Sequence, residues 1–236
     1  MAIFENIKGF IPTSLVDWDG KVVSVIFTPN CNFKCRFCSN RDLVLNSEKL
    51  KSIDFKDIRE YLSRNKEFVD GVVISGGEPT IYPDIEKLCE EIKKLGFKIK
   101  IDTNGSNPEM LKVLLDKKLV DYIAMDIKTD FEKYKEIVNS DIDTEKIKES
   151  ISILSQFPEY EFRTTIFPGV EEKDLIKIAE YLKENNANKG FFIQQFRPEI
   201  CIDEELEKEK PYSKEKILEF YESVKNFFEK SGIRNL

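Results

Sequence analysis

The 236-residue sequence contains no histidine, and this absence removes several kinds of catalytic and metal-binding site at once. Ser-His and Cys-His nucleophilic pairs are excluded, and so is every metal site that uses an imidazole ligand. A metal bound to this protein must therefore be held by cysteine or carboxylate groups.

The sequence also lacks long apolar segments. No stretch is long and apolar enough to span a membrane, and the N-terminus (MAIFENIKGF) has no signal-peptide hydrophobic run. We therefore expect a cytoplasmic protein with no membrane association. In that reducing compartment the five cysteines are expected to be thiols or metal ligands, because structural disulfides are rare there and an odd count suits no simple disulfide framework.

Positive charge is in short supply. The 37 Lys and Arg residues are outnumbered by 44 Asp and Glu residues, which gives a net charge of −7 and a pI near 5.1. Binding to a nucleic-acid backbone needs a positive footprint, so no nucleic-acid partner is expected. With 41% hydrophobic and 34% charged residues, the composition is typical of a folded globular protein, and the length suits a single domain over residues 1–236.

Strand-like and helix-like segments alternate from residue 21 onward. The predicted strands are 21–28, 71–75, 97–103, 121–127, 160–167 and 190–196. The predicted helices are 54–64, 84–95, one that opens at Asn107-Pro108, 144–155, 171–185 and 213–231. This alternation predicts a parallel α/β sheet with outer helices, and six strands are too few for a closed eight-stranded barrel. We therefore predict a partial, open (β/α)6 TIM-like barrel over 21–197, with an N-terminal extension (1–20) and a loop and C-terminal helix (198–236).

Polar motifs follow the predicted strands at their carboxyl ends, where parallel α/β folds place their sites. Residues 30–38 follow the first strand, and a Gly-Gly-Glu-Pro motif (76–79) follows the second. The motif Asp-Thr-Asn-Gly (102–105) ends the third strand. Asp126 and Lys128 end the fourth, and Gln194, Gln195 and Arg197 end the sixth. The sequence therefore predicts one site at this edge of the sheet.

Three cysteines lie within eight residues, at positions 31, 35 and 38. Soft thiolates suit iron–sulfur clusters or zinc. Clusters usually take four cysteine ligands, so three leave one position open, and an open metal position usually serves chemistry. A structural zinc site is the alternative. It would need a fourth ligand such as Cys89, Cys201 or a carboxylate, although Cys89 lies on the apolar face of its predicted helix.

The Cys-x3-Cys-x2-Cys spacing, followed after the next strand by Gly-Gly-Glu-Pro, resembles the radical S-adenosylmethionine (SAM) superfamily. Within it, residues 14–21 (SLVDWDGK) and the motifs DTNG (102–105) and MDIK (125–128) resemble the glycyl-radical-enzyme activases. These include the activating proteins of anaerobic ribonucleoside-triphosphate reductase and the pyruvate formate-lyase activating enzyme. The sequence departs at Ser39, where many activases have a histidine directly after the third cysteine.

The resemblance implies that Cys31, Cys35 and Cys38 hold three irons of a [4Fe–4S] cluster, whose fourth iron binds SAM. One electron then cleaves SAM to methionine and a 5′-deoxyadenosyl radical, which abstracts a hydrogen atom. The implied function is to generate a glycyl radical on a partner such as anaerobic ribonucleotide reductase, with ferredoxin or flavodoxin as electron donor. Two alternatives remain: a radical SAM enzyme that acts on a small molecule, similar to 7-carboxy-7-deazaguanine synthase, and a non-catalytic zinc protein.

The resemblance also implies a set of SAM contacts. The residues expected to bind the cofactors are Phe37, Asn40, Gly76, Gly77, Glu78, Asp102, Thr103, Asn104, Asp126, Lys128, Arg163 and Gln195. Among these, Phe37 packs on the adenine, the Gly-Gly-Glu backbone binds the methionine part, and Gln195 lies at the ribose. Asp102, Thr103 and Asp126 are expected to form a monovalent-cation site beside the SAM carboxylate, which Lys128 neutralises.

Simpler interpretations stand beside several of these roles. Phe37 is equally suited to packing inside the loop, Asp102 to capping the turn that follows it, and Lys128 to a solvated surface position. For Arg163 the residue itself carries the argument, because an arginine inside an otherwise buried strand needs an anionic partner.

Overall fold

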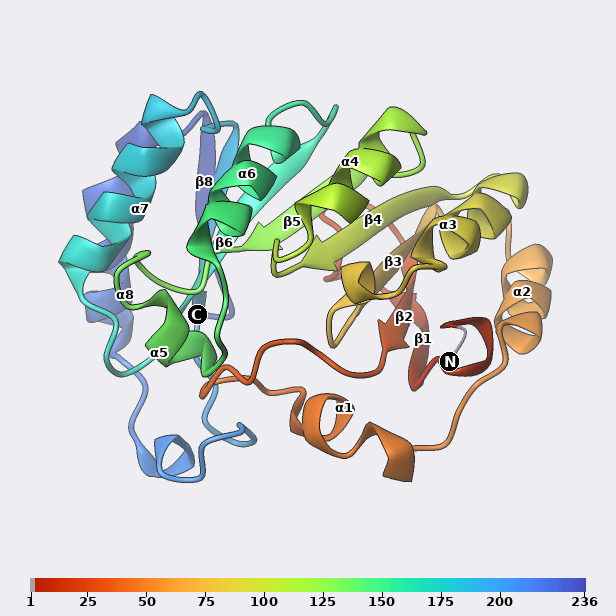
Figure 1. The fold of residues 1–236 in the computed structure, drawn as a ribbon, viewed down its shortest axis with the longest axis horizontal. Coiled ribbons are helices and arrows are strands. Elements are labelled where there is room, and N and C mark those ends of the chain that lie inside the picture. Colours follow the sequence, from red (N-terminus) through yellow and green to blue (C-terminus); the bar gives the residue numbers. More distant parts are fainter. Residues whose placement is uncertain (1–2) are drawn as a thin grey trace.

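The computed structural model describes residues 3–236, which are built around one curved sheet of eight strands in sequence order (Figure 1). The strands are β1 (Gly9–Ser14), β2 (Val23–Thr28), β3 (Gly71–Gly76), β4 (Lys98–Thr103), β5 (Tyr122–Asp126), β6 (Tyr160–Ile166), β7 (Gly190–Gln195) and β8 (Lys230–Arg234). Strand β1 is antiparallel to β2, and every later neighbour is parallel. This confirms the predicted α/β class and the open, barrel-like parallel sheet.

Most helices follow the parallel strands and lie along the outer face of the sheet, whereas two short ones, over residues 41–45 and 134–138, lie beside the loop that follows β2 (Figure 1). They are α1 (Arg41–Leu45), α2 (Phe55–Arg64), α3 (Ile85–Lys94), α4 (Pro108–Asp116), α5 (Tyr134–Val138), α6 (Thr144–Leu154), α7 (Glu172–Glu184) and α8 (Lys214–Val224). The predicted caps are confirmed. Asp54 accepts a hydrogen bond from the Lys56 amide at 2.8 Å, and Asn107 accepts one from the Met110 amide at 3.2 Å. No helix of residues 3–236 is long and apolar enough to cross a membrane.

Both edges of the sheet carry a strand that the sequence analysis missed. Strand β1 lies in the predicted N-terminal extension, and its residues Ile11, Pro12 and Thr13 are exposed, so it shows no burial alternation. At the other edge, the predicted helix 213–231 was wrong beyond Val224, where a 3-10 turn leads into β8. The error has a physical cause. Phe220, Val224 and Phe228 keep a helical spacing across the turn, whereas the free edge of β7 offers the backbone a strand partner.

The two faces of the sheet are packed differently. The outer face and the helices form the main core, to which β4 contributes Ile99 and Ile101. A smaller cluster of Trp18, Val23, Val25 and Val73 fills the concave face near the amino ends of the strands. The concave face is therefore closed at that end, and its cavity opens at the carboxyl ends.

Residues 15–20 form the floor of the concave face; we call them the floor segment. The Trp18 ring packs against Tyr122, with 5.7 Å between ring centroids, and Lys100 Nζ donates to the Asp17 carbonyl at 2.6 Å. Asp19 pairs with Arg234 of β8 at 3.2 Å. The floor segment therefore joins the middle of the sheet to its last strand.

A buried carboxylate links this floor to β6. Glu161 is 1% exposed, and it accepts two hydrogen bonds from Arg234 and one from the Tyr122 hydroxyl. Burial disfavours its ionised form, but the hydrogen bonds from Arg234 and the charges of Arg163 and Lys100 outweigh burial. The pKa of Glu161 therefore lies below its ordinary value.

This lowered pKa predicts a loss of stability in acid. A carboxyl whose pKa is lower in the folded than in the unfolded state stabilises the fold above the unfolded value, about 4.3, and loses that contribution as pH falls through the folded value. Glu161→Gln should lower the free energy of unfolding by about 3 kcal/mol at pH 7, because it breaks a buried ion pair. The free energy of unfolding of the variant should also fall less steeply as the pH is lowered. Urea unfolding at pH 7, 5 and 4 measures both effects. Glu159→Gln, at an exposed position nearby, is the control; equal acid sensitivity in wild type and Glu161→Gln would contradict the assignment.

Candidate active site

A cavity of about 410 Å³ lies at the carboxyl ends of the strands. All fifteen predicted site residues line it: Cys31, Cys35, Phe37, Cys38, Asn40, Gly76, Gly77, Glu78, Asp102, Thr103, Asn104, Asp126, Lys128, Arg163 and Gln195. The structure therefore brings the predicted residues together, although this placement by itself does not test their roles. Asp17, Ser75, Thr165 and Asn235 also line the cavity and were missed. Thr165 was detectable in the sequence, since it lies two residues beyond Arg163 on the same strand face.

The cysteine loop leaves β2 and is held from outside by helix α5. The Lys34 amide donates to the Val138 carbonyl at 2.8 Å, and Asn30 adopts a positive φ of 55° where the loop begins. Cys35 is 6% exposed, whereas Cys31 and Cys38 are half-buried. The loop thus presents all three thiols to the cavity from one short, anchored segment.

The electrostatics of the thiols suit a metal-bound state. Burial raises the pKa of Cys31 and of Cys35 to about 12, so both are neutral thiols in the protein alone. A positively charged group is needed to stabilise them as thiolates, and three soft sulfur donors are the chemistry that iron–sulfur clusters use. Hydrogen bonds to the Cys31 sulfur come from the Phe33 amide at 3.3 Å and from Asn104 Nδ2 at 3.6 Å. The donor set fits the implied cluster.

The remaining cysteines lie outside the cavity lining. Cys89 is fully buried in α3, and the Cys201 thiol donates to the Asp203 carbonyl at 3.1 Å. Within residues 3–236, no three cysteine, aspartate or glutamate side chains lie close enough together to hold a single metal ion.

The two glycines at the end of β3 are required by the close approach of the backbone at the end of β2 and the start of the cysteine loop. A Cβ on Gly77 would lie 1.6 Å from the Asn30 carbonyl oxygen, and Gly76 has a φ of +112°. The Gly77 amide donates to the Thr28 carbonyl, and Asn40 Nδ2 donates to the Gly76 carbonyl at 2.8 Å. The structure thus gives these glycines a close approach of protein backbone, and the expected contact of the Gly-Gly-Glu backbone with the methionine part of SAM stays a prediction.

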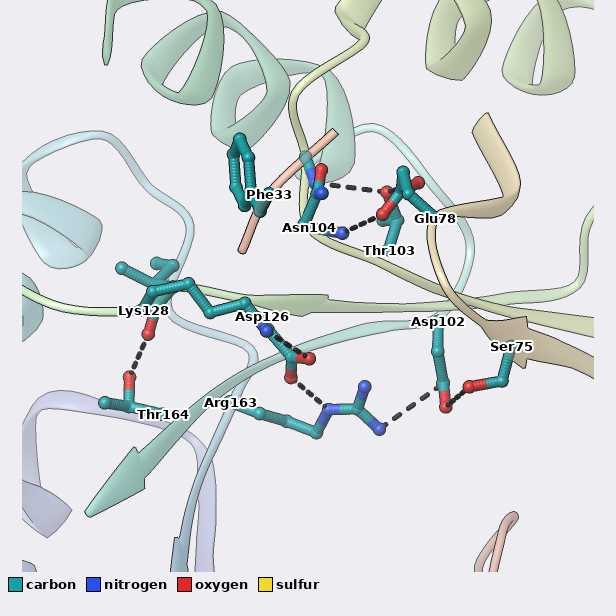
Figure 2. Close-up of polar contacts among 12 residues, drawn as sticks. Phe33, Ser75, Glu78, Asp102, Thr103, Asn104, Asp126, Lys128, Arg163 and Thr164 are labelled. Atoms are coloured by element: carbon teal, nitrogen blue, oxygen red, sulfur yellow. Dashed lines mark hydrogen bonds and ion pairs between the residues drawn. The ribbon is translucent and has the colours of Figure 1, made fainter. Parts of the chain in front are cut away.

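The Glu78 side chain fastens the Gly-Gly-Glu-Pro motif to the end of β4 (Figure 2). Its Oε1 accepts from the Thr80 amide at 3.0 Å, from the Thr80 hydroxyl at 2.6 Å and from the Thr103 hydroxyl at 2.7 Å. Its Oε2 accepts from the Asn104 amide at 2.6 Å. Burial raises the pKa of Glu78, and these four hydrogen bonds oppose the rise. Because both oxygens are used within the protein, this side chain acts as an internal brace.

Five charged side chains of alternating sign, two buried and three half-buried, form a row across β4, β5 with the residues just after it, and β6 (Figure 2 shows four of them). The row is Lys128, Asp126, Arg163, Asp102 and Lys100, with N–O distances along it of 2.9, 2.8, 3.3 and 3.4 Å. Three cations face two anions, so the row has one positive charge in excess. Burial disfavours an ionised Asp126, but Arg163 and Lys128 outweigh it and hold the pKa of this carboxyl below its ordinary range. Arg163 thus has the anionic partners that its place in a buried strand required.

A comparison with known families identifies this arrangement. The family model described as the Radical SAM superfamily matches residues 25–182. This range includes the cysteine loop and strands β2 to β6, except for the first two residues of β2. The chain belongs to the radical SAM superfamily. Over 98% of its length it is 35% identical to a Methanocaldococcus jannaschii protein named "Putative glycyl-radical enzyme activating enzyme", of which it covers 96%.

Several solved structures share the fold. Streptococcus suis SuiB bound to its precursor peptide SuiA has a TM-score of 0.69 at 19% identity, over 89% of this chain and 48% of SuiB. A domain of a pyruvate-formate lyase-activating enzyme from Bacteroides vulgatus has a TM-score of 0.56 at 19% identity, over 69% of this chain and 98% of that domain.

Several residues expected to contact SAM or a monovalent cation in this radical SAM enzyme also make contacts within the protein. Phe37 stacks on Phe167 with ring centroids 4.5 Å apart, so it packs inside the protein and also lines the cavity. Gln195 Nε2 donates to the Tyr212 carbonyl at 3.0 Å. Arg163 lies between Asp102 and Asp126, and the Thr103 hydroxyl turns to Glu78, so these groups do not face a common point. The monovalent-cation site stays a prediction.

Proposed function

We propose that this radical SAM enzyme generates a glycyl radical on a partner protein, after reductive cleavage of SAM at a [4Fe–4S] cluster held by Cys31, Cys35 and Cys38. The observation that carries the proposal is that the three thiols and four of the five charges of the row (Lys128, Asp126, Arg163 and Asp102) line one cavity. The named relative at 35% identity supports the activase assignment. Anaerobic ribonucleotide reductase is the proposed partner, and ferredoxin or flavodoxin is the proposed electron donor.

The bound cluster would supply one electron and an open iron position for SAM. The protein's own contribution is to orient SAM and to restrict water. The cavity volume of about 410 Å³ lies within the range of small-molecule sites. Ser39, which stands where many activases have histidine, also lines this cavity and is exposed.

The row of charges supplies the recognition of SAM. Its single excess positive charge complements the SAM carboxylate, and Lys128 lies at the end of the row beside the cysteine loop, with Nζ 5.9 Å from the centre of the Phe37 ring. Asp126 keeps Lys128 and Arg163 in fixed positions through bonds of 2.9 and 2.8 Å. Preorganised charges of this kind bind an ionic ligand without a further ordering cost.

The proposal is tested by anaerobic reconstitution with iron and sulfide, followed by reduction with dithionite in the presence of SAM. We expect 5′-deoxyadenosine to form. Addition of an anaerobic ribonucleotide reductase should then give a glycyl-radical signal in electron paramagnetic resonance. Failure of a cluster-loaded protein to form 5′-deoxyadenosine would contradict the proposal. Turnover of a small molecule without a glycyl radical would show that the protein is instead a radical SAM enzyme that acts on a small molecule.

Lys128→Met should weaken SAM binding about tenfold, because it removes the excess positive charge and one charge-assisted hydrogen bond. Isothermal titration of the reconstituted protein with SAM measures this change. Lys177→Met is the control, since Lys177 is exposed and pairs with Asp130 and Glu132, and none of the three lines the cavity. Equal SAM affinity in wild type and Lys128→Met would show that Lys128 only neutralises Asp126.

A further inference from the structure

One wall of the cavity is made of neutral polar side chains from the last strands of the sheet: Thr165 on β6, Gln194 on β7 and Asn235 directly after β8. We call these three residues the amide wall. Thr165 and Gln194 are register partners, and Gln194 is paired with Arg234, which precedes Asn235. Thr165 and Gln194 therefore lie side by side on neighbouring strands, and Asn235 lines the same cavity just beyond the end of β8.

The amide wall is not used by the protein's own hydrogen bonds. In the part of the chain that the structure describes, no protein group pairs with the three side chains, whereas the adjacent Gln195 is committed to the Tyr212 carbonyl. Thr165 and Gln194 are half-buried, so their polar groups are partly removed from water. Half-buried donors and acceptors without protein partners are suited to bind a ligand that supplies the complementary hydrogen-bonding groups.

The three side chains of the wall carry no charge and suit an uncharged part of a ligand, while Arg197, just after β7, also lines the cavity. The arginines on the same strands are already paired, Arg163 with Asp102 and Asp126, and Arg234 with Glu161 and Asp19. Hydroxyl and carboxamide groups both donate and accept hydrogen bonds. A peptide main chain presents the matching pattern, one N–H and one C=O per residue.

The dimensions also suit a peptide. Neighbouring strands lie about 4.8 Å apart, so groups on three strands extend over about 10 Å, which is the length of about three extended residues. Along β6, Thr165 stands two residues beyond Arg163, about 7 Å nearer the mouth of the cavity. A segment on the amide wall would thus lie beside the proposed position of SAM.

We propose that Thr165, Gln194 and Asn235 bind the main chain of the segment that contains the target glycine. The inference rests on the proposed function and adds the means of substrate recognition. Glycine suits this contact, because without a Cβ its main chain can lie close to the wall. In the reaction, one C–H bond of the glycine α-carbon breaks and one forms at the 5′-carbon of the deoxyadenosyl radical. The products are 5′-deoxyadenosine and a glycyl radical.

The test uses an acetylated and amidated Ala-Ala-Gly-Ala-Ala peptide whose glycine carries two deuteriums at the α-carbon. Mass spectrometry follows deuterium transfer into 5′-deoxyadenosine by the reconstituted full chain. We expect the double variant Thr165→Val, Gln194→Leu to raise the KM for the peptide about tenfold or more, and to affect the KM for SAM much less. Gln156→Leu, at an exposed position just after α6, should match wild type.

A second probe separates main-chain binding from a general loss of fit. Replacing the glycine N–H by an ester oxygen should raise the KM for the peptide severalfold with the wild-type protein, and much less with the double variant. Equal peptide KM values for wild type and the double variant would overturn the inference. So would 5′-deoxyadenosine without deuterium, or competition by a free purine base in place of the peptide. If wild type makes no 5′-deoxyadenosine at all, the proposed function fails, and the inference fails with it.

Discussion

Replacing Cys35 with alanine is expected to abolish cluster assembly and SAM cleavage together. Cys35 is the most buried thiol of the loop, at 6% exposure, and no other cysteine of residues 3–236 lines the cavity besides Cys31 and Cys38. With two thiolates left, a cluster that needs three cannot be held. Iron and sulfide content after anaerobic reconstitution, visible absorbance and 5′-deoxyadenosine formation should all fall to background.

The matched controls for this result are the cysteines outside the site. Cys89→Ala empties a small volume in the α3 core and should cost about 1 kcal/mol of stability, but the cluster should still assemble. Cys201→Ser should also retain the cluster. A Cys35→Ala protein with normal iron content and SAM cleavage would remove Cys35 from the ligand set, and loss of the cluster in Cys201→Ser would make Cys201 a candidate ligand.

The site could be predicted from the sequence because its motifs depend on local, repeating rules. Each parallel strand is a short apolar run, and each ends in polar residues at the same edge of the sheet, so the strand pattern alone places Asp102, Asp126 and Arg163 together. The rule works for β2 to β7, whose helices and strands have the expected periods. It fails for β1 and β8, which are edge strands specified by a partner strand and not by their own pattern.

The sequence could not show which polar groups pair with each other. Thr103 follows Asp102 directly, yet alternation along β4 turns its hydroxyl away from Asp126 and toward Glu78. The floor segment is similar, because Trp18 and Asp19 contact strands far along the chain. Such contacts depend on the curvature of the sheet, which a one-dimensional pattern does not contain. Motifs therefore predicted the membership of the site better than its internal bonding.

Glu78 illustrates this difference, and its replacement is expected to have the largest effect on stability. Glu78→Ala would leave four donors without their acceptor: the amide and hydroxyl of Thr80, the hydroxyl of Thr103 and the amide of Asn104. An unsatisfied buried donor costs about 1–3 kcal/mol. The two hydroxyls can rotate to other acceptors and water can enter the space left by the side chain, so the total cost is smaller than the sum for four donors. We expect the free energy of unfolding to fall by about 4 kcal/mol. Urea unfolding of the cluster-free protein measures it, and Glu67→Ala, at an exposed position, should change it by less than about 0.5 kcal/mol.

The same residue separates two explanations of the Gly-Gly-Glu-Pro motif. The resemblance implies a SAM contact by the backbone of this motif; if the Glu78 carboxylate itself bound SAM as well, Glu78→Gln should lower SAM affinity and leave the free energy of unfolding nearly unchanged. If it is the brace that its hydrogen bonds indicate, the new NH2 group would face donors, and stability should fall even without SAM. Asn104, which donates to both Asn32 and the Cys31 sulfur, would lose its fixed position at the same time. We therefore expect Glu78→Gln to reduce the stability of the cluster-free protein first, and SAM binding only as a consequence.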